Sequence, residues 1–254
     1  MLKVALSGVG QAAVCSALRF IPWFVLSIAA AVPIVSASAA DYCKKGGGAV
    51  AADLSGPVDD KFLKKMREIG VTTIIRYYDY EPPTLPKKTL HKKERDKIVG
   101  AGFSVAVVFQ HHNNNFSSFT PQRGRNDAIR SLVLAKENLQ TKGSVIYFGV
   151  DGGWGTAEQL KSIESYFKAA NAELKPSGYR VGVYGGGLVC KTLLEKKLAE
   201  VCWLANAKSW PGYADSFKSR RWKLVQSLPS KCGGKEVDFN VTNGTDTDFG
   251  QFGL

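Results

Sequence analysis

The chain has 254 residues, a hydrophobic share of 44% and a formal net charge of +12 at pH 7. This length and composition suit one sizeable folded domain. The positive charge favours an anionic partner, such as cell wall or a membrane surface, although a solvated basic face explains it equally well. Because no nucleic-acid-binding motif accompanies the charge, we expect no nucleic acid among the partners.

Residues 1–40 have the order of a secretory signal. They carry Lys3 and Arg19 without any acid, then the apolar stretch "FIPWFVLSIAAAVPIV" and the small residues "SASAA". We expect cleavage after Ala40, which leaves 41–254 as one domain. An uncleaved membrane anchor is the alternative, and the prolines of the stretch argue against it. No later apolar stretch is long enough to span a membrane, so we expect a protein that is secreted, periplasmic or associated with the cell wall.

Strand-like and helix-like segments alternate along the rest of the chain. The strand-like segments span 49–55, 72–78, 104–110, 144–151, 179–185, 200–207, 221–227 and 235–241. Helical spacing is found over 58–70, 87–102 and 125–140, and again from Thr156, which forms a capping box with Gln159. Apolar strands of this kind are typical of parallel strands covered by helices.

This alternation predicts an α/β fold, a compact (β/α)8 TIM-like barrel with reduced final helices. An open doubly wound sheet is the alternative, but no Gly-rich phosphate fingerprint follows the first strand.

Four cysteines remain beyond the predicted leader, an even number that is typical of disulfides in an oxidising compartment. Three pairings are possible. We favour Cys190 with Cys202, which closes a short loop, and Cys43 with Cys232, which ties the start of the domain to its end. No CxxC spacing occurs, so a metal site is the weaker interpretation.

Polar side chains occur where the predicted strands end, and in a barrel these ends meet at one mouth. A single acid at a strand end is more often a helix cap, but three acids on three strands favour a shared cleft. The candidate catalytic residues are Asp53, Asp151 and Asp238. The candidate substrate-binding residues are Arg76, Tyr78, Gln110, Trp154, Tyr184, Asn206, Gln226 and Asn240.

The positions of the three acids suggest how they face one another. Asp53 and Asp238 lie on the first and last strands, which are neighbours in a closed barrel and roughly 4.8 Å apart, close enough for the carboxyl pair of a retaining glycosidase. Asp151 comes from the fourth strand, across the mouth. The run "HHNNN" at 111–115 is interpreted as a solvated loop, and we expect neither a metal nor another cofactor.

Several motifs, in order, resemble a known family: "DLSGPVD", "IIRYYDYE", "VAVVFQHHNNN", "IYFGVDG", "GYRVGVYGGGLVC", "CWLANAKSWPGY" and "KEVDFNV". They are similar to the glycoside-hydrolase-like domain of unknown function 1906, related to the family-25 lysozymes, which cleave the peptidoglycan glycan. The resemblance implies a TIM-like barrel. It matches Asp53 to the acid of the first strand, Asp151 to the first acid of an Asp-x-Glu pair, and Asp238 to the acid near the last strand. Gly153 stands where those lysozymes keep the Glu.

The sequence thus predicts a secreted, monomeric glycoside hydrolase whose partner is cell-wall polysaccharide or another anionic glycan. Asp151 is expected to be the general acid, while Asp53 or Asp238 steadies the oxocarbenium-like transition state or orients a substrate N-acetyl group. A non-catalytic carbohydrate-binding barrel is the alternative, and Gly153 favours it. A metal-dependent phosphodiesterase is a more distant third hypothesis.

Overall fold

The computed structural model describes residues 42–81, 84–85, 87–244 and 247–253. The predicted leader, residues 1–40, lies outside these described residues. Across the described ranges, the helices are all too short or too polar to cross a bilayer.

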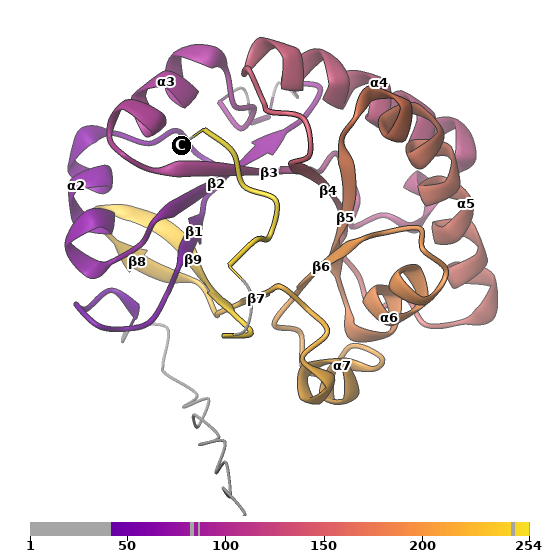
Figure 1. Ribbon diagram of the computed structural model, residues 1–254. Coiled ribbons are helices and arrows are strands. Elements are labelled where there is room, and N and C mark those ends of the chain that lie inside the picture. Colours follow the sequence, from indigo (N-terminus) through magenta and orange to yellow (C-terminus); the bar gives the residue numbers. More distant parts are fainter. Residues whose placement is uncertain (1–41, 82–83, 86, 245–246, 254) are drawn as a thin grey trace, which may run out of the picture. The chain divides into compact units, whose positions relative to one another are not determined.

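The strands form a closed eight-stranded barrel surrounded by helices, which confirms the predicted TIM-like barrel (Figure 1). Neighbouring strands pair in parallel from β1 to β7, and β9 closes the ring by pairing with both β7 and β1. All eight predicted strands are present. Their bounds are β1 Ala51–Asp53, β2 Thr73–Tyr78, β3 Ser104–Phe109, β4 Val145–Val150, β5 Arg180–Gly185, β6 Val201–Leu204, β7 Leu224–Gln226 and β9 Lys235–Thr242.

The last barrel strand, β9, runs antiparallel to both of its neighbours. A parallel return needs a crossover of roughly a dozen residues or more, and the connection over 227–234 holds only the short strand β8 (Ser230–Cys232), which forms a hairpin with β9. The chain therefore turns back without a helix. As a result, the end of the barrel at which β1–β7 finish, here called the mouth, receives the amino-terminal half of β9.

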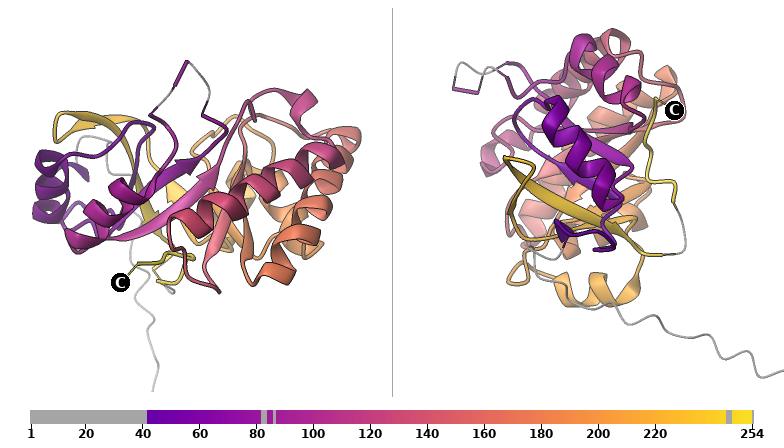
Figure 2. Two further views of the ribbon diagram at one scale, coloured as in Figure 1. Left: turned by 90° about the horizontal axis from the view of Figure 1, so that it is seen from above. Right: turned by 90° about the vertical axis from the view of Figure 1, so that its left-hand side faces the viewer.

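Helices cover the outside of the barrel, and α4 and α5 lie side by side along it (Figure 2). The α-helices are α2 Asp60–Ile69, α3 Lys92–Gly100, α4 Pro121–Glu137, α5 Ala157–Leu174, α6 Gly187–Glu195 and α7 Tyr213–Ser219. Two 3-10 turns, η1 Phe116–Ser118 and η2 Lys175–Ser177, accompany them. α7 has only seven residues, in line with the reduced final helices that were predicted.

Helix α4 begins earlier than the predicted 125–140. Thr120 caps it by accepting a hydrogen bond from the backbone N–H of Arg123, and Pro121 occupies the first turn, where its missing N–H costs nothing. The capping box of Thr156 and Gln159 at the start of α5 is present as predicted.

The two faces of each strand pack in different places. Residues two apart share a face, and one set fills the barrel interior while the other packs against the helices. The interior core comprises Ala51, Ile75, Ala106, Val108, Val145, Tyr147, Val201, Trp203, Leu224 and Phe249. This alternation continues to the mouth and decides which polar side chains point into it.

The C-terminal segment covers the end of the barrel opposite the mouth. The backbone N–H of Val145 donates to the Gly250 carbonyl at 3.0 Å, and the Tyr147 hydroxyl donates to the Phe249 carbonyl at 2.6 Å. Phe252 forms a β-bridge with Val105 near the start of β3. In Figure 1 this segment crosses the ring of strands in yellow.

Two disulfides join the cysteines, Cys43 with Cys232 and Cys190 with Cys202, which confirms the favoured pairing. The first ties the start of the described chain to the β8–β9 hairpin. The second ties α6 to β6.

Candidate active site

Asp53 and Asp238 form an acid pair at the mouth. They are direct cross-strand partners on β1 and β9, and Asp53 is only 2% exposed. The Gln226 amide nitrogen donates to both Asp53 oxygens at 3.3 Å and to Asp238 Oδ2 at 3.2 Å, so one amide bridges the two carboxyls. Asn240 Nδ2 donates to Asp53 at 2.7 Å, and the Tyr77 hydroxyl donates at 3.4 Å.

This environment favours a retained proton on the acid pair. Burial, and then the negative charge of Asp238, raise the pKa of Asp53 from 3.8 to about 7, although the hydrogen bonds from Asn240, Gln226 and Tyr77 oppose the shift. Burial also raises the pKa of Asp238 from 3.8 to about 6. The two carboxyls titrate as a unit, and that unit holds a proton close to neutral pH.

A second row of side chains orients the two amides. The Tyr184 hydroxyl donates to Gln226 Oε1 at 2.8 Å, and Trp203 Nε1 donates to Asn240 Oδ1 at 2.7 Å. Because each amide oxygen is taken, each NH₂ group is directed at the acids. The rings of Tyr184 and Trp203 lie 4.7 Å apart in an edge-to-face contact, which ties β5 to β6 beneath the site.

Asp151 lies at the end of β4 and stands apart from the acid pair's hydrogen bonds. Its Oδ2 accepts a hydrogen bond from Gln110 Nε2 at 3.1 Å. Burial raises its pKa, while Gln110 and the positive charge of Lys88 oppose the rise. Asp151 follows β4 at the same end of the barrel at which β1 ends in Asp53, and burial, followed by the charges of all three acids, raises the pKa of Tyr184. The structure therefore brings all three predicted acids to one mouth.

Lys88 is a mouth residue that sequence reasoning missed. It lies in the loop between β2 and α3, with its ammonium 3.0 Å from Asp79 Oδ2, 5.1 Å from the centre of the Tyr77 ring, and donating to the Gln110 carbonyl. Position 88 looks like one more lysine in a basic helix. Only the fold reveals that its side chain is 10% exposed and adjoins the residue that holds Asp151.

Arg76 and Tyr78 do not face the mouth, so their prediction as substrate-binding residues is wrong. Arg76 is fully buried on the outer face of β2, where its Nε pairs with Glu94 at 2.8 Å and its Nη1 donates to the Leu54 carbonyl at 2.7 Å. Tyr78 is also fully buried and donates to Gln140 at 3.0 Å. Tyr77, between them, has the opposite phase and points inward.

Asn206 and Trp154 lie near the mouth but outside the acid pair's network. The side-chain oxygen of Asn206 accepts a hydrogen bond from Tyr213 of α7 at 3.1 Å. The Trp154 ring packs 5.5 Å from Phe116, and its indole nitrogen is buried without a hydrogen-bond partner. Gln110, Tyr184, Gln226 and Asn240, in contrast, contact the acids or orient the groups that do.

The run "HHNNN" is more ordered than the predicted solvated loop. His111 Nδ1 lies 2.6 Å from Asp79, and Asn113 is 1% exposed and donates to the Gly149 carbonyl at 2.8 Å. Asn115 accepts from the backbone N–H of Ser117 and so caps η1. These groups brace the loop after β3. Among the described residues, we find no cluster of three or more His, Cys, Asp or Glu placed to hold a metal ion.

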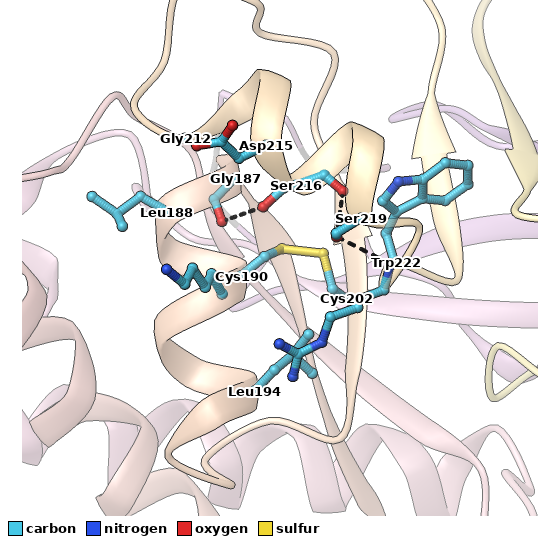
Figure 3. A pocket seen from close by; sticks show the side chains of 12 residues that line it. Gly187, Leu188, Cys190, Leu194, Cys202, Gly212, Asp215, Ser216, Ser219 and Trp222 are labelled. Carbon is cyan, nitrogen blue, oxygen red and sulfur yellow. Dashed lines mark hydrogen bonds between the residues drawn. A yellow bond between two sulfur atoms is a disulfide. The ribbon is translucent and has the colours of Figure 1, made fainter.

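A cavity of about 340 Å³ lies on the outside of the barrel, between α6 and α7 (Figure 3). The Cys190–Cys202 disulfide, Leu194 and Trp222 line it, and Ser216 crosses its upper edge to donate to the Gly187 carbonyl at 2.8 Å. None of the three mouth acids is among its lining residues. The acids therefore belong to the mouth and not to this cavity.

Gly153, two residues after Asp151, lies under the indole of Trp210. A Cβ atom at this position would be 3.2 Å from Trp210 Cδ1. The place where the resemblance expects a Glu side chain is thus beside an aromatic ring.

Comparison with solved structures shows the same fold in proteins of low identity. The Tat-secreted protein Rv2525c of Mycobacterium tuberculosis, solved with L-tartrate, is 21% identical with a TM-score of 0.67, over 80% of this chain and 98% of that one. An uncharacterized B. stearothermophilus protein is 18% identical with a TM-score of 0.60, over 80% and 99%. The catalytic domain of endolysin ply40, from bacteriophage P40 of Listeria monocytogenes, is 14% identical with a TM-score of 0.50, over 78% and 93%.

The sequence also matches a family model. No curated protein matches the chain. The model described as "Rv2525c-like, glycoside hydrolase-like domain" matches residues 64–249, a range that includes Asp151 and Asp238 and begins after Asp53. This range is well over half of the chain, and the chain therefore belongs to the family of Rv2525c-like, glycoside hydrolase-like domains.

Proposed function

We propose that this protein is an extracytoplasmic glycoside hydrolase that acts on cell-wall glycan at the barrel mouth. The observation that carries the proposal is the placement of three carboxyls at the mouth, two of which are cross-strand partners bridged by Gln226, with burial raising the pKa of both. Glycoside hydrolysis needs an acid that is still protonated and a second carboxylate that is not. The family and the fold shared with an endolysin catalytic domain support a cell-wall substrate.

The two sides of the mouth suit the two roles in the order opposite to that expected from sequence. Asp238, the more exposed member of the acid pair, donates its proton to the glycosidic oxygen as the bond to the anomeric carbon breaks. The carbonyl oxygen of the substrate's own N-acetyl group closes on that carbon. Asp151, held by Gln110 across the mouth, orients the acetamido N–H and balances the developing positive charge. Water then opens the cyclic intermediate and returns the proton to the acid pair.

Export of the protein is part of the proposal. Two disulfides suit an oxidising compartment, the predicted leader would direct export, and the relative Rv2525c is Tat-secreted. We further propose that residues 41–254 act as one monomeric domain.

A non-catalytic carbohydrate-binding barrel is the second candidate. The indole of Trp210 above Gly153 favours it, because this position lacks the Glu that the lysozyme-like barrels use. Positioned acid catalysis contributes roughly 10²–10⁴-fold, so the absence of that Glu must be offset by the acid pair if the protein is an enzyme.

Release of reducing sugar from purified peptidoglycan tests the proposal. The wild-type protein is compared with Asp53→Asn, Asp151→Asn and Asp238→Asn, and Asp60→Asn serves as the matched control because its carboxylate is 89% exposed on α2. A hydrolase requires release by the wild type and the control, and a fall of about 10²-fold or more in the mouth variants. Binding without release by any form would identify the binding barrel instead.

A further inference from the structure

A short strap crosses two glycine-rich turns at the mouth. Residues 210–212, with the sequence "WPG", lie between β6 and α7. They rest on the turn "DGGWG" after β4 and on "YGGG", which joins the end of β5 to the start of α6. A Cβ on Gly155 would lie 2.7 Å from Pro211 Cγ. A Cβ on Gly187 would lie 2.1 Å from the Gly212 carbonyl oxygen, which is backbone and unable to move aside. Gly155 and Gly187 are therefore explained by the strap that they admit.

Backbone hydrogen bonds also hold the strap in place. The backbone N–H of Leu188 donates to the Pro211 carbonyl at 2.8 Å, and the N–H of Trp210 donates to the Ala207 carbonyl at 2.9 Å. Gly212 adopts a φ of +72°, a conformation that side chains disfavour, and lets the chain turn directly into α7. The position of the Trp210 side chain is consequently set by backbone contacts on both sides of it.

Two of the glycines form the bed of the Trp210 indole. A Cβ on Gly153 would be 3.2 Å from Cδ1 of the ring, and a Cβ on Gly186 would be 3.2 Å from Cε3. The five-membered ring thus lies over the end of the β4 turn and the six-membered ring over the start of α6. Trp210 remains partly exposed. Its indole covers Gly153, which follows Asp151 by only two residues in the chain.

We propose that Trp210 is a sugar-binding platform, a subsite that holds the apolar face of an N-acetylated sugar ring beside Asp151. An indole is a rigid, flat, apolar surface with little conformational entropy to lose, which suits the C–H face of a pyranose. Trp154 suits this role less well, since it packs against Phe116 and its indole nitrogen is buried. The platform rests on the proposed glycan substrate, but it requires binding and not hydrolysis.

The platform also accounts for Gly153. A Cβ there would lie 3.2 Å from the indole, so any larger residue, Glu included, requires the ring to shift by a few tenths of an ångström from its present position. In this chain the turn after Asp151 contributes to sugar binding where the lysozyme-like pattern would contribute an acid.

Titration of the full chain with soluble chitotetraose tests the platform. Labelling with 5-fluorotryptophan gives each indole its own fluorine resonance, and Trp210→Phe identifies that of Trp210. We expect this resonance to shift with sugar, and Trp210→Ala to raise the dissociation constant about tenfold or more. Gly153→Ala should weaken binding several-fold because its methyl group displaces the ring, while leaving every carboxyl in place.

Two controls match these variants. Trp222→Phe alters an indole outside the mouth, in the cavity between α6 and α7, and Gly56→Ala adds a methyl group where nothing lies within 4 Å. Both should bind as the wild type does. Gly153→Ala keeps the test valid if Trp210→Ala does not fold.

The outcomes separate the platform from hydrolysis. Binding that depends on Trp210 supports the platform, even when the same samples release no sugar from peptidoglycan and the hydrolase proposal fails. Equal dissociation constants for the wild type, Trp210→Ala and Gly153→Ala overturn the platform, even if sugar release continues. Failure of the wild type to bind chitotetraose overturns it too.

Discussion

The two sides of the barrel mouth hold their carboxyls in different ways. On the side of β1, β7 and β9, the acid pair Asp53–Asp238 lies within a closed network in which every amide has a fixed orientation. On the side of β4, Asp151 has one side-chain hydrogen bond, a cation nearby and a glycine turn beyond it. The first side is built to retain a proton. The second holds its carboxyl by fewer contacts, so changes on the two sides should differ in size and in pH dependence.

Removal of the acids should show that the pair acts as one group. We expect Asp238→Asn and Asp53→Asn each to lower sugar release by about 10²-fold or more, and the double variant to lower it hardly further. Asp151→Asn should combine with either loss in a nearly additive way, because it performs a separate task. Rates from a double-mutant cycle on purified glycan measure this. Additive losses for Asp53 and Asp238 would argue that they are independent.

The acid pair should make the folded protein less stable as pH rises. The folded pKa of Asp53 is about 7 against 3.8 for the free side chain, so between these values the folded state binds more protons than the unfolded state. The free energy of unfolding therefore falls across this range, by up to about 4 kcal/mol from Asp53. Urea unfolding between pH 4 and pH 8 measures the slope. Asp53→Asn should flatten it, whereas Asp60→Asn should leave it unchanged.

Loss of the bridging amide should weaken activity and alter its pH dependence. Gln226→Leu removes a donor that lowers the pKa of Asp53, so the pKa of the acid pair rises. We expect about a tenfold lower rate at pH 6, and we expect the alkaline limb of the pH–rate profile to shift to higher pH. An unshifted limb would mean that Gln226 does not act on the proton-holding group.

Lys88→Met should affect the other side of the mouth and by a smaller factor. Its positive charge lowers the pKa of Asp151, so the variant should show a higher pKa for this carboxyl and a rate reduced a few-fold. Carbon NMR titration of the Asp151 carboxyl measures the shift directly. Because Lys88 also pairs with buried Asp79, a thermal unfolding curve should accompany the titration.

Much of the barrel is predictable from local patterns. Apolar runs located all eight strands, and their shared ends located the three acids at one mouth. The direction of β9 was not predictable in the same way, because the residue pattern of a strand does not show whether it runs parallel or antiparallel to its neighbours. The short connection over 227–234 was the available signal, since it is too short for a parallel crossover.

The facing of β2 shows where the prediction of the site failed. In "TIIRYY" both faces are largely apolar, so period-two alternation does not reveal which set is inside. The place of Arg76 and Tyr78 at the end of a predicted strand favours both as mouth residues, but Tyr77, between them, is the one that reaches Asp53. The residues of β2 that face the barrel interior can be identified from a neighbouring strand only once the pairing register of the two strands is known.

Closure of the barrel by β9 has a consequence for how the protein is made. Asp53 comes from the first barrel strand and Asp238 from the last, so the acid pair forms only where β1 and β9 pair to close the barrel. A nascent or truncated chain that lacks β9 has no acid pair at all. Such long-range contacts form late in folding. The acid pair of the mouth thus becomes available only after β9 has paired with β1, and the site stays unfinished until that strand is in place.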